Sequence, residues 1–225
     1  MRILTVMLMA LCGAVPAQAG LVTISELLYN GPGADDGKTF VELYGPPGLD
    51  LEGWFLAGVN GNGGGFTDLV DLGIVTFPSN GFVVLADEHK AGGTSVANAD
   101  FLFVDLDFQN GPDSVQLLFG SVVMDALGYG SFGPSDIFAG EGIAAPGVGP
   151  GESLSRVFAD VDTGVNLYDF EVLTLPTPGT GRFSPVEPVV TPEPGTWVLF
   201  GAGLVLLAAR AKRRGRSSEK SPHPD

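Results

Sequence analysis

Short apolar runs alternate along the chain with turns that are rich in glycine, proline and asparagine. Runs of this length, with many β-branched and aromatic residues between such turns, are typical of β-strands. They predict strands at residues 21–29, 39–44, 51–57, 69–77, 82–86, 101–108, 114–119 and 122–129, and a last ordered stretch at 154–175. Gly120 and Ser121 separate two strands by the two residues of a tight hairpin. The pattern therefore predicts an all-β sandwich over residues 20–183, with loops at 60–65 and 130–151.

The N-terminus has the three parts of a secretory signal peptide. Met1-Arg2 is a short positive region, an apolar run follows it, and Ala17-Gln18-Ala19 is a small-x-small cleavage site. We therefore expect residues 1–19 to be removed by signal peptidase, so that the mature chain begins at Gly20. Cys12, the only cysteine of the sequence, would be lost with this segment. Disulfides, thiol catalysis and thiolate metal sites are then excluded from the mature chain.

The C-terminus also has three parts in a fixed order. Residues 191–194 read Thr-Pro-Glu-Pro, residues 195–209 are apolar, and a basic cluster follows them. The cluster consists of Arg210, Lys212, Arg213, Arg214 and Arg216. A helix over 195–209 would be about 22 Å long and would need its flanking cations to reach the membrane interface. The positive-inside rule places the basic cluster and the polar tail at 217–225 in the cytoplasm, and the β-domain on the opposite side.

These C-terminal residues resemble the PEP-CTERM sorting signal of Gram-negative bacteria, which covers residues 191–216 here. The resemblance rests on Pro192-Glu193-Pro194, the apolar helix after it, and Arg210, Arg213 and Arg214. It implies recognition by an exosortase, a membrane protease-transferase, after a transient stay in the inner membrane. The destination would be the cell surface, outer envelope or extracellular matrix. The tail after the basic cluster departs from the family, and a plain single-pass anchor is the alternative.

The order of the strand motifs carries a second resemblance, to the lamin-tail domain. This domain is an immunoglobulin-like β-sandwich of nuclear lamins and many exported bacterial proteins. The matching segments are Ile24–Asn30, Phe40–Tyr44, Leu51–Leu56, Phe82–Ala86, Asp113–Leu117, Val122–Tyr129, Glu152–Arg156, Asp169-Phe170 and Thr177–Gly179. The resemblance implies a non-catalytic binding or structural module, joined by a linker at 184–190 to the sorting signal. Fold-level likeness does not name a ligand, and exopolysaccharide or other surface proteins are the expected partners.

Charge narrows the choice of partners. Residues 20–194 contain 24 acidic and four basic residues, a formal net charge of −20. Such a charge repels phosphates, so we expect no nucleic-acid partner. It suits a soluble exported protein, and the alternative is a protein that collects divalent cations.

The candidates for catalysis are few. His89 is the only histidine of the exported part, and it lies in a polar cluster without a recognisable nucleophile nearby in the sequence. Glu26 and Glu42 fall on successive predicted strands and could in principle act as an acid–base pair. We favour a structural role, in which they bind backbone amides, Arg156 or water. The sequence therefore predicts a protein that is not an enzyme, with an unrecognised hydrolase as the weakest alternative.

One segment has the spacing of a calcium loop. Asp160, Asp162 and Asn166 offer alternating oxygen ligands, and Glu171 is twelfth when Asp160 is counted as first. The glycine of the loop, Gly164, is fifth where an EF-hand has it sixth, and no flanking helices are evident. A solvated turn without a cofactor is the favoured interpretation, and a calcium-dependent surface adhesin is the alternative function.

Overall fold

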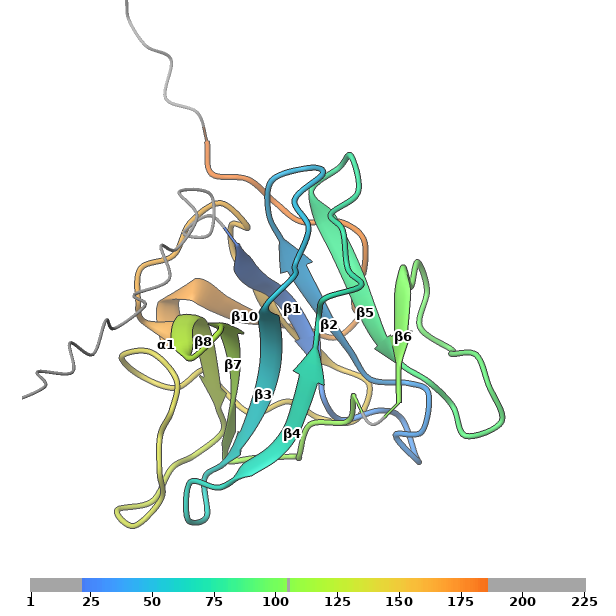
Figure 1. The fold of residues 1–225 in the computed structure, drawn as a ribbon. Helices are drawn as coiled ribbons and strands as arrows, with labels where there is room; N and C mark the ends of the chain where they lie inside the picture. The colour runs from blue at the N-terminus through green and yellow to red at the C-terminus, as the bar shows by residue number, and fades with distance from the viewer. Residues whose placement is uncertain (1–21, 105, 186–225) are drawn as a thin grey trace, which may run out of the picture. The chain divides into compact units, whose positions relative to one another are not determined.

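The alternating segments fold into two β-sheets with almost no helix, so the all-β prediction is confirmed (Figure 1). The computed structural model describes residues 22–104 and 106–185. The strands in this part of the chain are β1 (Thr23–Leu28), β2 (Phe40–Tyr44), β3 (Trp54–Asn60), β4 (Phe66–Asp71), β5 (Phe82–Asp87), β6 (Phe101–Phe103), β7 (Asp113–Phe119), β8 (Val122–Tyr129), β9 (Ser153–Arg156) and β10 (Phe170–Leu173). A single helical turn, α1 (Asn166–Asp169), precedes β10.

The larger sheet has six strands in the order β10-β9-β1-β2-β5-β6, and the smaller has four in the order β4-β3-β7-β8. Neighbouring strands run antiparallel except β5 and β6, which are parallel. The predicted hairpin across Gly120 and Ser121 joins β7 to β8. Gly120 has a φ of 59°, a backbone conformation that glycine adopts without steric cost.

One hydrophobic core lies between the two sheets. Leu43 and Leu85 of the larger sheet and Trp54 and Leu117 of the smaller sheet belong to it, and each is at most 1% exposed. At one end of the core the rings of Tyr29 and Tyr129 stack with their centroids 4.1 Å apart. Burial of each large apolar side chain contributes about 1.5–3 kcal/mol, which makes this interface the main source of stability.

The outer face of the larger sheet is covered as well. A second apolar cluster is formed there by Leu28, Phe40, Val84 and Ala86. Val96 and Ala99, from the segment between β5 and β6, pack on this cluster. Strands buried on both faces read as continuous apolar runs, and any charged residue among them must find a partner inside the protein.

Two strand predictions need correction. The core strand predicted at 69–77 is wrong, because β4 ends at Asp71 and is an edge strand whose Leu69 is 64% exposed. The chain then turns, with the amide of Val75 donating to the carbonyl of Leu72 at 2.9 Å. The strand predicted at 101–108 is too long, since β6 ends at Phe103. In both segments buried apolar residues continue beyond the end of the strand. A prediction based on hydrophobicity alone therefore placed the end of each strand too far along the chain.

Several predicted segments lie outside the described residues. They are the signal peptide at 1–19, all but the first residues of the linker at 184–190, the sorting signal at 191–216 and the tail at 217–225. Among the described residues no helix has the length and apolar character required to cross a bilayer.

Candidate functional site

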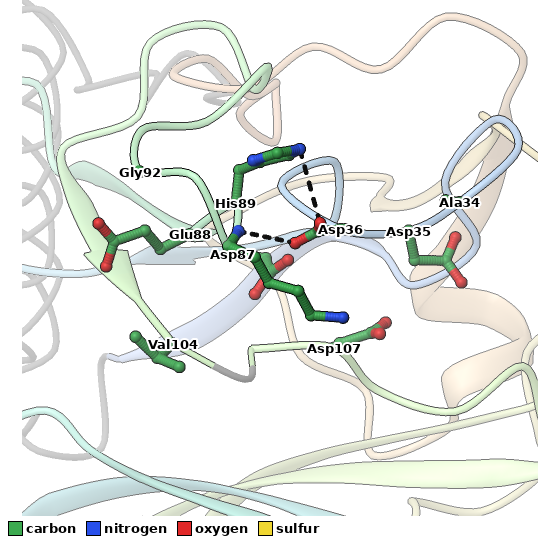
Figure 2. A pocket seen from close by; sticks show the side chains of 10 residues that line it. Ala34, Asp35, Asp36, Asp87, Glu88, His89, Gly92, Val104 and Asp107 are labelled. Carbon is green, nitrogen blue, oxygen red and sulfur yellow. Dashed lines mark hydrogen bonds and ion pairs between the residues drawn. The ribbon is translucent and has the colours of Figure 1, made fainter.

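A pocket of about 630 Å³ opens beside the C-terminal end of β5 (Figure 2). Its walls come from the loop between β1 and β2, from the segment after β5 and from the segment after β6. The residues that line it are Ala34, Asp35, Asp36, Asp87, Glu88, His89, Lys90, Gly92, Val104 and Asp107. Acidic side chains therefore dominate this pocket, and no serine, threonine or cysteine is among these ten residues.

The imidazole of His89 is already engaged within the pocket. Its Nε2 lies 3.5 Å from Oδ2 of Asp36, and its Nδ1 accepts a hydrogen bond from the amide of Ala91 at 2.9 Å. Asp36 also accepts from the amide of Lys90 at 3.0 Å. A neutral imidazole has one nitrogen lone pair, and here Ala91 occupies it, so His89 is poorly placed to take a proton from a substrate.

The predicted carboxylate pair lies side by side in the larger sheet. Glu26 of β1 and Glu42 of β2 are directly opposite each other in the strand register, and both are 0% exposed. Glu26 accepts hydrogen bonds from Oγ of Ser153 at 2.6 Å and from the amide and hydroxyl of Thr177 at 3.0 Å and 2.9 Å. Glu42 accepts from the amide of Gly179. The segment Thr177–Gly179, called the capping loop below, thus closes over both carboxyl groups.

Burial changes the protonation of this pair. It raises the pKa of Glu42 to about 8, against the opposing effect of the hydrogen bond from Gly179, and the charge of Glu26 raises it further. Burial also raises the pKa of Glu26, which its bonds from Ser153 and Thr177 lower again. Oε1 of Glu42 has no hydrogen-bond partner among the described residues, and a buried oxygen without a donor disfavours the ionised form. Of the partners predicted for the pair, the structure provides backbone amides.

Arg156 of β9 is instead the centre of a separate buried ion cluster. Its Nη2 lies 2.7 Å from Oδ2 of Asp125, and both side chains are 0% exposed. Its Nε donates to the carbonyl of Ile24 at 2.9 Å, and its guanidinium lies 4.6 Å from the centroid of the Phe170 ring. The same Oδ2 of Asp125 accepts from the amide of Ile24 at 2.6 Å. The cluster ties β8 of the smaller sheet to β1 and β9 of the larger one.

Asp125 was not predicted as a site residue. It is the only charged residue in the apolar strand Val122–Tyr129, and Arg156 is one of four basic residues in the exported part. An isolated carboxylate in an apolar strand, in a domain with few basic residues, was the available signal, since buried charges are normally paired.

The four residues of the predicted calcium loop form hydrogen bonds or ion pairs with different partners. Asp160 accepts from the amide and hydroxyl of Ser184 at 2.8 Å and 2.6 Å, and Glu171 forms an ion pair with Arg182. The reason is local: α1 stands between Asp162 and Glu171, so the chain does not wrap around a single centre as an EF-hand loop does.

The other two residues lie near the buried ion cluster. Oδ1 of Asn166 accepts from the amides of Gly128 and Glu141 at 2.9 Å and 2.8 Å, and its Nδ2 donates to the carbonyl of Ala126 at 2.7 Å. Asp162 lies 3.5 Å from Nη1 of Arg156. The structure therefore does not bring the four predicted residues together, and only Asp162 joins a carboxylate cluster that could hold a metal ion.

Comparison with known families finds the PEP-CTERM protein-sorting motif at residues 190–214. This range contains Pro192, Glu193, Pro194, Arg210, Arg213 and Arg214, and it lies outside the described residues. No curated protein matches the chain. Proteins with this motif are exported and processed at the membrane by exosortase-like enzymes. The match thus confirms the predicted sorting motif and indicates a cell-surface or extracellular destination.

Proposed function

We propose that this protein is an exosortase-sorted surface or matrix protein whose domain is an immunoglobulin-like β-sandwich of the lamin-tail type. The domain acts as a non-catalytic binding or structural module. The sorting motif at 190–214 supports the destination, and the two sheets with their shared core support the sandwich.

One observation carries the non-catalytic role. The charged residues of the lamin-tail resemblance bind other parts of the domain itself. Glu26 and Glu42 accept hydrogen bonds from the capping loop, and Arg156 pairs with Asp125 inside the protein. Charged groups that are buried and bound in this way join the sheets to each other and to the capping loop, and they are not presented to a substrate.

Charge indicates what the module binds. A net charge of −20 on residues 20–194 disfavours polyanionic partners, so we propose a neutral polysaccharide or a cationic surface protein. The acidic pocket beside β5 offers carboxylate oxygens, which accept hydrogen bonds from sugar hydroxyls or protein amines.

Intact mass measurement of the protein recovered from cell envelope and medium tests the sorting. We expect a species that begins at Gly20 and ends near Pro194. A species in the inner membrane that retains residues 195–225 would make the motif a plain anchor and would contradict the proposed destination.

A separate assay tests the non-catalytic role. The purified protein and a Glu26→Gln variant would be compared in a broad screen of hydrolase substrates. We expect no turnover by either protein. Turnover by the wild type that Glu26→Gln abolishes would show that the carboxylate pair is catalytic, whatever the destination of the protein.

A further inference from the structure

A cluster of three carboxylates lies beside Arg156, and the proposed function leaves two of them, Glu141 and Asp162, without a role. It consists of Asp125 in β8, Glu141 in the loop after β8, and Asp162 in the loop before α1. One carboxylate oxygen from each residue lies within 4.8 Å of the others. Asn166 positions Glu141 against β8, because its Oδ1 accepts from the amides of both Glu141 and Gly128.

Two buried oxygens of this cluster have no donor. Both donors of Asp125, the amide of Ile24 and Nη2 of Arg156, bind its Oδ2, and its Oδ1 has no hydrogen-bond partner among the described residues. Oε2 of Glu141 is likewise buried without a partner in the part of the chain that the structure describes. An unpartnered carboxylate oxygen inside a protein is costly, and two of them in one cluster indicate a missing cation.

We propose that Asp125, Glu141 and Asp162 bind a calcium ion. The spacing of the oxygens fits this ion, because Ca²⁺ coordinates oxygen at about 2.3–2.6 Å and two of its ligands can therefore be up to about 5 Å apart. Asp162, whose side chain is 36% exposed, connects the site with solvent, from which waters would complete the six to eight ligands that calcium takes.

The charges around the cluster favour a divalent cation. Four carboxylates, those of the three proposed ligands and of Asp169, surround the single guanidinium of Arg156, whose Nη1 lies 3.6 Å from Oδ2 of Asp169. Arg156 therefore leaves an excess of negative charge that Ca²⁺ would reduce.

Three carboxylates and water make a weak site, with an expected Kd on the order of 10⁻⁴–10⁻³ M, as in extracellular calcium modules. The site differs from the loop at 160–171 that the sequence suggested, with which it shares only Asp162. It is independent of the proposed destination, since it depends only on groups within the domain.

Titration calorimetry with CaCl₂ tests the site directly on the full chain, purified in nonionic detergent and freed of metal with EDTA. We expect one site per chain and a rise in Tm of about 3–11 °C in about 10 mM calcium. KCl at matched ionic strength serves as the control for screening of the large negative charge and should give a much smaller rise.

Glu141→Gln should weaken calcium binding at least tenfold, while Glu52→Gln, which removes one exposed carboxylate elsewhere, should leave binding unchanged. Without calcium, Glu141→Gln should melt at the wild-type temperature or higher, because it removes a charge that Asp125 and Asp162 disfavour. A purely structural role of Glu141 would instead lower that Tm.

Asp162→Asn is the second variant, since its amide oxygen can still accept the hydrogen bond from Gly164 that stabilises the loop. It should also weaken calcium binding. The proposal is overturned if the wild type shows neither a calcium-dependent heat nor a calcium-specific rise in Tm. It is equally overturned if both variants bind calcium as the wild type does.

Discussion

Glu42→Gln should remove much of the pH dependence of stability between pH 5 and pH 7. Glu42 is fully buried, and its pKa in the folded protein is about 8, against an ordinary value of 4.5. At neutral pH the folded protein therefore keeps this proton, and the unfolded chain releases it. Since the folded state binds more protons, the stabilisation is fully present below pH 4.5 and is lost as the pH rises through 8.

The magnitude follows from the two pKa values. One pKa unit corresponds to about 1.36 kcal/mol. Titration of Glu42 in the unfolded chain and in the folded protein therefore lowers the free energy of unfolding by about 2.5 kcal/mol between about pH 5 and pH 7. The glutamine side chain of the variant resembles the protonated acid in shape and carries no charge, so the variant should lack this loss. Glu141, whose pKa is also raised, acts in the same direction in both proteins and cancels in the comparison. Glu26 is coupled to Glu42, so the difference between the two proteins measures the titration of the pair.

Urea unfolding at several pH values, followed by circular dichroism, measures the effect. The wild type should lose about 2.5 kcal/mol more than Glu42→Gln between about pH 5 and pH 7, equivalent to roughly 5–10 °C in Tm. Glu52→Gln, at an exposed position, should follow the wild-type profile. Parallel curves for wild type and Glu42→Gln would show that Glu42 is ionised in the folded protein and would refute the reasoning.

Three further changes test other parts of the structure. Arg156→Ala leaves Asp125 buried without its cation, so the free energy of unfolding measured in urea should fall by about 3–5 kcal/mol. Gly61→Ala places a Cβ against the carbonyl oxygen of Pro112, which is backbone and cannot swing away, so thermal melting should show a loss of about 1–3 kcal/mol. Glu193→Ala should leave the uncleaved chain in the inner membrane, as detected by intact mass, and normal sorting would show that this residue is not recognised.

The strands could be predicted where local pattern and burial agree. The hairpin of β7 and β8 was predicted to within one residue, because two apolar runs flank a glycine turn of the right length. The pattern failed at 69–77, where Leu72, Val75 and Phe77 are buried beyond the end of β4. Burial of these residues comes from a turn that packs on the core, and sequence alternation does not distinguish such a turn from a strand.

For the site residues, prediction from the sequence was limited by contacts between segments that are far apart in the chain. The hydrogen bonds of Glu26 and Glu42 to backbone amides could be anticipated, because a buried carboxylate must be satisfied and amides are the commonest donors. The calcium loop could not be judged from spacing, since α1 turns the chain before Glu171. The cluster of Asp125 and Glu141 depends on a loop that folds back on β8, a contact that no local pattern records.

The capping loop also determines how the domain would respond to force. A pull applied at Ser184 must first break the hydrogen bonds to Asp160 and then those from the capping loop to Glu26 and Glu42. Along the backbone the load reaches β10, which lies at the edge of the sheet, only after these bonds fail, while the ion pair of Arg182 with Glu171 links the C-terminal end to β10 through side chains. Tension on the C-terminal end is thus shared between this exposed ion pair and β1 and β2 in the middle of the sheet. The force needed to detach the capping loop should therefore vary with the protonation of Glu26 and Glu42, the two carboxyl groups that it covers.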